Sequence, residues 1–152
     1  MTIQQISTAP SSISVGDSYI WTVPGEKVGQ YWPDIIKFLL MIEDPEWTTD
    51  EVYEQIVNKE AQVWGVVTDG EINGIWITKI IEGRDRYGLV WISAGRGNER
   101  VSLSEGIALF LTCTEQWFKE KGCRYVKIVG RRGWMKVLPG FKEHAVELRK
   151  YL

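Results

Sequence analysis

The strongest constraint on the fold of this chain is a hairpin signal, two strand-like segments joined by the dipeptide Asp69-Gly70. Asp-Gly favours the type I′ turn that links adjacent antiparallel strands. The preceding strand is expected at 62–68, and the following one, at 72–81, alternates between an apolar and a mixed face. A polar loop at 83–86 separates it from a third strand at 87–93. We therefore expect three consecutive antiparallel strands in the middle of the chain.

Two helices are expected before these strands. Apolar residues recur at helical spacing over residues 28–41. Proline lacks an amide hydrogen and is tolerated only near the first turn of a helix, so Pro33 predicts that the regular helix starts at about Trp32. Thr48 and Glu51 have the spacing of a capping box, in which the threonine hydroxyl accepts a hydrogen bond from the first turn. A second helix is therefore expected to begin at Thr48.

A long helix is expected at 103–121, closed by Gly122 as its C-terminal cap. The remaining elements are, in chain order, a strand at 19–23, a strand at 124–129, a short helix at 133–138 and a final strand or hairpin at 141–152. The nearly continuous apolar character of 124–129 predicts a central position in the sheet. The chain is divided into a polar, flexible N-terminal arm, residues 1–17, and a single domain, residues 18–152.

Composition and charge argue against several classes of function. The net charge of −2 predicts no bulk attraction to nucleic acid or to a membrane surface. No metal site is expected, because the chain has two cysteines without a CxxC motif and one histidine. Cys113 and Cys123 are typical of reduced thiols in an intracellular protein. With neither a signal-peptide pattern nor an apolar run of about 18 residues, we expect a cytoplasmic location and no membrane span.

The order of elements over residues 19–152 resembles that of the GNAT superfamily of N-acetyltransferases. The stretch 125–141 is similar to the family's fifth strand, fourth helix and Leu-Gly-Phe turn, with Leu138, Gly140 and Phe141 matching the turn and Pro139 inserted in it. This resemblance implies an α/β (α+β) fold with a mixed, mostly antiparallel central sheet flanked by helices. It also implies acyl-CoA-dependent N-acyl transfer with acetyl-CoA as the cofactor.

The resemblance implies a cofactor site beside the long helix. In the family, the pyrophosphate of CoA is held by a glycine-rich loop at the N-terminus of this helix, where free backbone N–H groups and the helix dipole attract an anion. Ser102 and Glu105 have capping-box spacing and would occupy the same backbone donors. The candidate cofactor-binding residues are Trp91, Ser93, Arg96, Gly97, Arg100, Arg131 and Arg132. The arginines among them suit bidentate phosphate contacts.

The catalytic residues stay unknown from the sequence. Family members often place a glutamate on the fourth strand and a tyrosine near the turn, but residues 87–93 contain no carboxylate and residues 134–136 read Trp-Met-Lys. A base for the amine and an acid for the leaving thiolate are needed. The substitutes that we consider are water and the side chains of Tyr125, Cys123, His144 and Glu143.

Two hypotheses of different classes follow. The first is an acyl-CoA-dependent N-acyltransferase, in which backbone N–H groups of the strand edge at residues 91–93 polarise the thioester carbonyl. The second is a non-enzymatic GNAT-like protein, because the loop before Leu103 lacks the family's glycine spacing, the usual acid and base are absent, and the chain has many tryptophans and a polar arm. Residues 130–134, Gly-Arg-Arg-Gly-Trp, are also similar to small GNAT-like proteins of bacteriophages. Such a protein would be a virion component or would bind a host partner, in the host cytoplasm or the virion. Eight tryptophans, together with the arginines, would supply a surface for a protein partner or a homo-oligomer.

Overall fold

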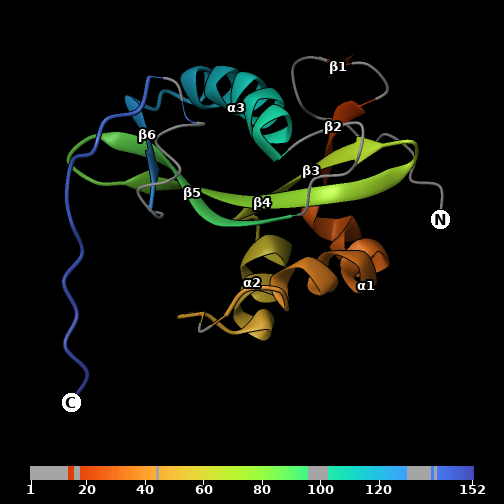
Figure 1. Cartoon of the computed structure of the whole chain (residues 1–152), viewed down its shortest axis with the longest axis horizontal. Coiled ribbons are helices and arrows are strands. Elements are labelled where there is room, and N and C mark those ends of the chain that lie inside the picture. The colour runs from red at the N-terminus through yellow and green to blue at the C-terminus, as the bar shows by residue number, and fades with distance from the viewer. Residues whose placement is uncertain (1–13, 16–17, 44, 96–102, 130–137, 139) are drawn as a thin grey trace.

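The computed structural model of the chain describes residues 14–15, 18–43, 45–95, 103–129, 138 and 140–152 (Figure 1). Its elements are β1 (Ser14–Val15), β2 (Ser18–Val23), the 3₁₀ turn η1 (Gly25–Lys27), α1 (Val28–Leu39), α2 (Thr49–Val57), β3 (Gln62–Thr68), β4 (Glu71–Glu82), β5 (Arg86–Gly95), α3 (Leu103–Glu120) and β6 (Tyr125–Ile128). The arm predicted at 1–17 lies largely outside the described residues, although β1 pairs with β2.

The described strands form one sheet in the order β1-β2-β3-β4-β5-β6. All neighbours are antiparallel except β5 and β6, which are parallel. The hairpin between β3 and β4 turns at Asp69 and Gly70, whose φ angles of 52° and 78° are the positive values that a type I′ turn requires. The predicted class, a mixed and mostly antiparallel sheet flanked by helices, is confirmed.

The two faces of the sheet are covered by different helices (Figure 1). Helices α1 and α2 pack on one face against a core around Trp21, which is fully buried. Helix α3 packs on the other face, where the ring of Phe110 stacks on Trp76 with centroids 4.5 Å apart. Large aromatic side chains bury the most area per residue, so three of the eight tryptophans, Trp21, Trp64 and Trp76, form the centre of the two cores.

Helix α1 starts earlier than the sequence predicts. It begins at Val28, directly after η1, and Pro33 lies inside it. The proline removes one hydrogen bond, to the carbonyl of Gly29. That loss is offset because the helix buries a continuous apolar stripe against the sheet, and burial dominates the stability of amphipathic helices in proteins. The buried residues of the stripe are Val28, Tyr31, Ile35, Phe38 and Leu39.

The ends of α2 and α3 follow the capping rules, with one exception. The backbone N–H of Glu51 donates to the hydroxyl of Thr48 at 3.1 Å, which confirms the predicted cap. Both helices close with the paired hydrogen bonds of a Schellman motif, which places one residue in the left-handed region. In α3 this residue is Gly122, as predicted, with φ of 78°. In α2 it is Lys59, with φ of 62°, where a side chain is strained.

Two predictions about the C-terminal part are wrong. The strand at 124–129, now β6, was expected in the centre, but it is the last strand in the order of the described sheet, and Tyr125 is 48% exposed. Apolar composition alone does not distinguish a central strand from an edge strand. Residues 141–152 hold neither strand nor helix, and they run away from the body as an extended tail (Figure 1). Strand propensity needs a hydrogen-bonding partner strand, and the described residues provide none for this segment. All but Leu138 of the predicted helix at 133–138 lies outside the described residues.

Candidate functional site

The parallel pair β5–β6 separates half-way along β5. The two strands are in register from Tyr87 opposite Tyr125 to Val90 opposite Ile128. β6 ends at Ile128, whereas β5 continues to Gly95. Within the described residues no strand pairs with the β6 side of β5 beyond Val90. Every second backbone N–H and C=O along a strand points to the same side. The segment from Trp91 to Gly95 therefore presents hydrogen-bonding groups on the β6 side of β5. We call this segment the diverging edge of β5.

A β-bulge lies at the point of divergence. Thr78 of β4 is opposite Val90, but Ile77 is opposite Ile92, so Trp91 is an extra residue in β5. The bulge places Trp91 and Ile92 on the same face, against the core under α1 and α2. Ser93 is opposite Trp76 and lies on the α3 face. Bulges re-aim side chains and occur next to active sites more often than elsewhere in sheets.

Helix α3 runs antiparallel to β5, with its N-terminus at the diverging end. A Cβ on Gly106 would lie 3.8 Å from the ring of Trp76, the residue opposite Ser93. Near the other end, the ring of Phe118 packs directly on Gly88. Twelve residues of helix span about 18 Å and five residues of strand about 17 Å, so the two contacts agree. The positive end of the α3 dipole is therefore next to the diverging edge of β5.

Lys79 lies on the face of the sheet that α1 and α2 cover, opposite the α3 face. Its Nζ atom is 3.5 Å from the ring centroid of Trp91, within the range of a cation–π contact. Partial burial lowers the pKa of Lys79, and the nearby carboxylates of Glu51 and Glu60 oppose this shift. The bulge thus brings an aromatic ring and an amine with a lowered pKa together on the α1–α2 face. Lys79 is not among the site residues predicted from the sequence, although a lysine within the mostly apolar segment 75–81 is itself a signal.

The predicted cofactor residues divide into two groups. Trp91 and Ser93 lie on the diverging segment of β5, on opposite faces. The other five, Arg96, Gly97, Arg100, Arg131 and Arg132, lie outside the described residues, and so do Ser102 and residues 134–136.

The substitute catalytic residues do not gather at the diverging edge. Tyr125 stacks on Tyr87 at 5.0 Å, at the paired end of β5 and β6. Cys123 is half-buried in the turn before β6, and burial raises the pKa of its thiol, which favours the protonated and less nucleophilic form. His144 and Glu143 are on the exposed C-terminal segment. None of these side chains therefore gains support as a catalytic residue.

Metal and membrane sites have no counterpart in the part of the chain that the structure describes. Its histidine, cysteine and acidic side chains form no cluster of three or more that could hold a metal ion. None of its helices combines the length and apolar character needed to cross a bilayer.

Comparison with known proteins identifies the fold. No protein-family model matches the chain, and no curated protein sequence matches it. Among solved structures, an aminoglycoside acetyltransferase from an uncultured soil metagenomic sample superposes with a TM-score of 0.66 at 14% identity, covering 90% of this chain and 97% of its own.

Two further acetyltransferases superpose over a similar share of the chain. The ribosomal-protein-alanine N-acetyltransferase of Brucella melitensis gives a TM-score of 0.61 at 15% identity, over 89% of this chain and 97% of its own. A GNAT family acetyltransferase of Staphylococcus aureus gives 0.61 at 12% identity, over 90% and 100%. At these identities the likeness is one of fold, and the chain has the fold of the GNAT acetyltransferases.

Proposed function

We propose that the protein is an acyl-CoA-dependent N-acyltransferase with acetyl-CoA as the acyl donor. The observation that carries this proposal is the diverging edge of β5, which faces the N-terminus of α3 and begins at the Trp91 bulge. An acyl thioester needs an oriented hydrogen-bond donor for its carbonyl oxygen, and a diphosphate needs a positive site some distance away. The strand edge and the helix end would supply both on one side of the molecule.

The residues of this chain would act mainly by positioning. Acetyl-CoA supplies the activated acyl group as a thioester. Backbone N–H groups between Trp91 and Ser93 donate to the thioester carbonyl, and this interaction strengthens as negative charge develops on its oxygen. The incoming amine attacks the carbonyl carbon, the C–N bond forms, the C–S bond breaks, and the amine proton leaves through water to the departing thiolate. Holding the two reactants side by side lowers the barrier because it removes an entropy cost.

The phosphates would be bound near the N-terminus of α3. We assign this role to Arg96, Gly97 and Arg100 in the segment before the helix, and to Arg131 and Arg132 after β6. The guanidinium groups would bind phosphate oxygens in pairs. These five residues are proposed from the sequence and from the position of the α3 terminus.

The acceptor is proposed to be a primary amine. The named substrates of the structural neighbours differ widely, from aminoglycosides to the alanine of a ribosomal protein and glucosamine 6-phosphate. A panel of one amine of each kind is therefore the appropriate first screen. Release of free CoA thiol, followed by a thiol-reactive dye, reports turnover with any acceptor.

Isothermal titration calorimetry with acetyl-CoA tests the proposal. Saturable binding is expected for the native protein, and Ser93→Phe should weaken it about tenfold or more, since a ring on the α3 face would obstruct the diverging edge. Thr112→Phe is the matched control, because Thr112 is on the exposed side of α3. Melting temperatures of both variants establish that they fold. Absence of heat and of any thermal shift at millimolar acetyl-CoA would overturn the proposal.

One observation favours the non-enzymatic alternative. The tail that follows Gly140 exposes apolar side chains, with Leu148 at 90% and Tyr151 at 85%, and such side chains are common in partner contacts. A virion component or a host-binding protein would use them. Association with a partner, without acetyl-CoA binding, would support this alternative, whereas turnover of acetyl-CoA would exclude a purely structural role.

A further inference from the structure

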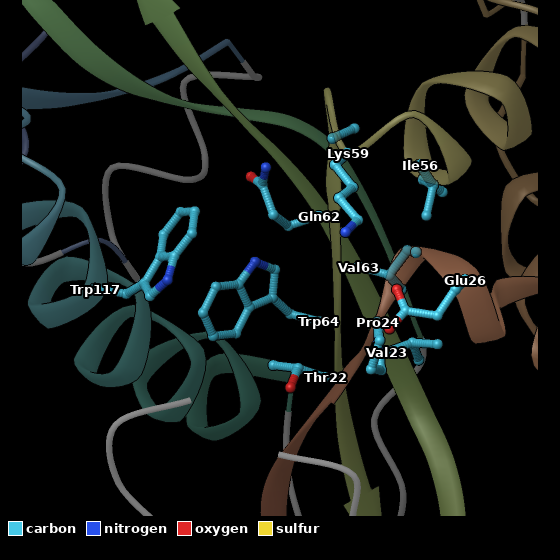
Figure 2. A pocket seen from close by; sticks show the side chains of 12 residues that line it. Thr22, Val23, Pro24, Glu26, Ile56, Lys59, Gln62, Val63, Trp64 and Trp117 are labelled. Atoms are coloured by element: carbon cyan, nitrogen blue, oxygen red, sulfur yellow. The ribbon is translucent and has the colours of Figure 1, made fainter. Parts of the chain in front are cut away.

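A cavity lies at β2 and β3, on the other side of β4 from the diverging edge of β5. It has a volume of about 290 Å³ and opens between the end of β2, the end of α2, the start of β3 and helix α3 (Figure 2). Trp117 of α3 lines it. This residue is 14 positions after Leu103, the first residue of α3, so the cavity lies about 21 Å along the helix from its N-terminus. The cavity is therefore separate from the α3 N-terminus, where the phosphates of acyl-CoA are proposed to bind.

The cavity has an apolar floor and a charged rim. Ile56, Val63 and Trp64 are each at most 2% exposed and form the floor. Glu26 and Lys59 are exposed at the rim, and Figure 2 shows the Lys59 ammonium and the Glu26 carboxylate pointing toward each other across it. No ion pair within the described chain joins either of them to another residue. One positive and one negative group thus face the same small space.

A chain of hydrogen bonds orients a third polar group toward the cavity. The indole N–H of Trp64 can only donate, and it donates to the Thr78 hydroxyl at 2.9 Å. That hydroxyl must therefore use its own proton for the amide oxygen of Gln62, 3.0 Å away. The NH₂ group of Gln62 is left as a donor, and in Figure 2 this amide lies between the Trp117 ring and Lys59.

The backbone at Lys59 indicates that its side chain has a use. Lys59 occupies the left-handed position of the α2 Schellman motif, with φ of 62°. The equivalent position of α3 is Gly122, which adopts this conformation without the clash of a Cβ atom. Strained non-glycine residues cluster at ligand-binding sites, where the side chain is needed. Here the strain keeps an ammonium group at the rim of the cavity.

We propose that this cavity binds a small zwitterion, a free α-amino acid with an apolar side chain. The ligand carboxylate would contact Lys59 and the Gln62 NH₂, and its ammonium would contact Glu26. Its side chain would lie on the floor beside the rings of Trp64 and Trp117, which meet edge to face at an interplanar angle of 74° with centroids 5.5 Å apart. A rim of both signs selects against ligands that carry only one charge.

The probe is L-phenylalanine, compared with phenylalaninamide, which lacks the carboxylate, and 3-phenylpropionate, which lacks the ammonium. Binding is measured by calorimetry and by the indole N–H resonances of Trp64 and Trp117, assigned from Trp→Phe variants. We expect L-phenylalanine to shift both resonances and to bind more tightly than either analogue. Acetyl-CoA is absent from these titrations, so the result does not depend on the proposed acyltransferase activity.

Two variants test the assigned contacts. Lys59→Gly should weaken the binding of L-phenylalanine about two- to fivefold, the range of an exposed ion pair. It should leave the affinity for phenylalaninamide unchanged. It should also maintain or raise the melting temperature, because glycine relieves the strained backbone. Glu26→Gln should weaken the binding of L-phenylalanine by a similar factor but should not weaken the binding of 3-phenylpropionate. Glu54→Gln, on the exposed side of α2, serves as the control. The proposal is overturned if neither indole resonance shifts at millimolar L-phenylalanine, or if neither rim variant changes the affinity for L-phenylalanine.

Discussion

Packing of α3 onto β5 at Gly88 determines where the helix N-terminus lies relative to the diverging edge. Gly88 is buried, and Phe118 above it is 1% exposed. In Gly88→Ala, the new Cβ would lie 2.6–2.7 Å from three atoms of the Phe118 ring, against 3.4 Å for an ordinary contact. The ring must therefore retreat by the difference, up to 0.8 Å (3.4 minus 2.6). Overpacking of this kind costs about 1–3 kcal/mol.

The effect is measurable by thermal and urea unfolding followed by circular dichroism. For a chain of this length each kcal/mol lowers the melting temperature by about 2–4 °C, so a fall of about 2–12 °C is expected. Gly83→Ala is the matched control, because its Cβ would meet only ordinary contacts, at 3.4 Å and beyond. It should change the free energy of unfolding by less than about 0.5 kcal/mol.

A double-mutant cycle isolates the contact. Phe118→Leu removes the ring that the new methyl group meets, so Gly88→Ala should be less destabilising in that background, by about 0.5–3 kcal/mol. If the two substitutions instead add, or if Gly88→Ala alone is neutral, α3 does not pack on β5 at this point. The position of its N-terminus over the Trp76–Ser93 pair would then be wrong.

Three further outcomes are expected. Gly106→Ala should stabilise the protein by up to about 1 kcal/mol in urea unfolding, because the methyl group has room, its nearest atom at 3.8 Å, and alanine favours the helix; destabilisation would mean that the first turns of α3 lie closer to the sheet. Since the pKa of Lys79 is lowered by burial, the unfolded chain binds more protons in the window between that lowered value and the ordinary lysine pKa. The free energy of unfolding should therefore rise with pH across this window in the native protein, and Lys79→Met should lack that rise; parallel pH profiles would refute it. Iodoacetamide should label native Cys123 more slowly than free cysteine at pH 8, because burial raises the pKa of its thiol. Buried Cys113 should react only on unfolding. Rapid labelling of the native protein, detected by mass spectrometry, would contradict both expectations.

The local elements of this fold are predictable because their signals are short-range. The Asp69-Gly70 turn and the cap at Thr48 each depend on residues within one turn of chain, and both form as expected. Gly122 closes α3 for the same reason. Pro33 misleads because its cost of one hydrogen bond is local, whereas the burial that offsets it comes from the whole sheet face.

The site is less predictable because its geometry depends on pairing between distant segments. The bulge at Trp91 is a register shift between β4 and β5, and no dipeptide signals it. The contact of Lys79 with Trp91 follows from that shift. The exposed tail at 141–152 shows the converse, since the sequence predicts a strand or hairpin there, yet no strand of the described sheet hydrogen-bonds to it.

The proposed function requires that the acyl donor binds at the diverging edge of β5. Backbone amide NMR during a titration with acetyl-CoA tests this requirement. The amides of Trp91, Ile92 and Ser93 should shift progressively and saturate, together with those at the N-terminus of α3. Amides at the paired end, around Tyr87, should change little. Saturable binding that leaves residues 91–95 unperturbed, or no perturbation at all at millimolar acetyl-CoA, would contradict the proposed site.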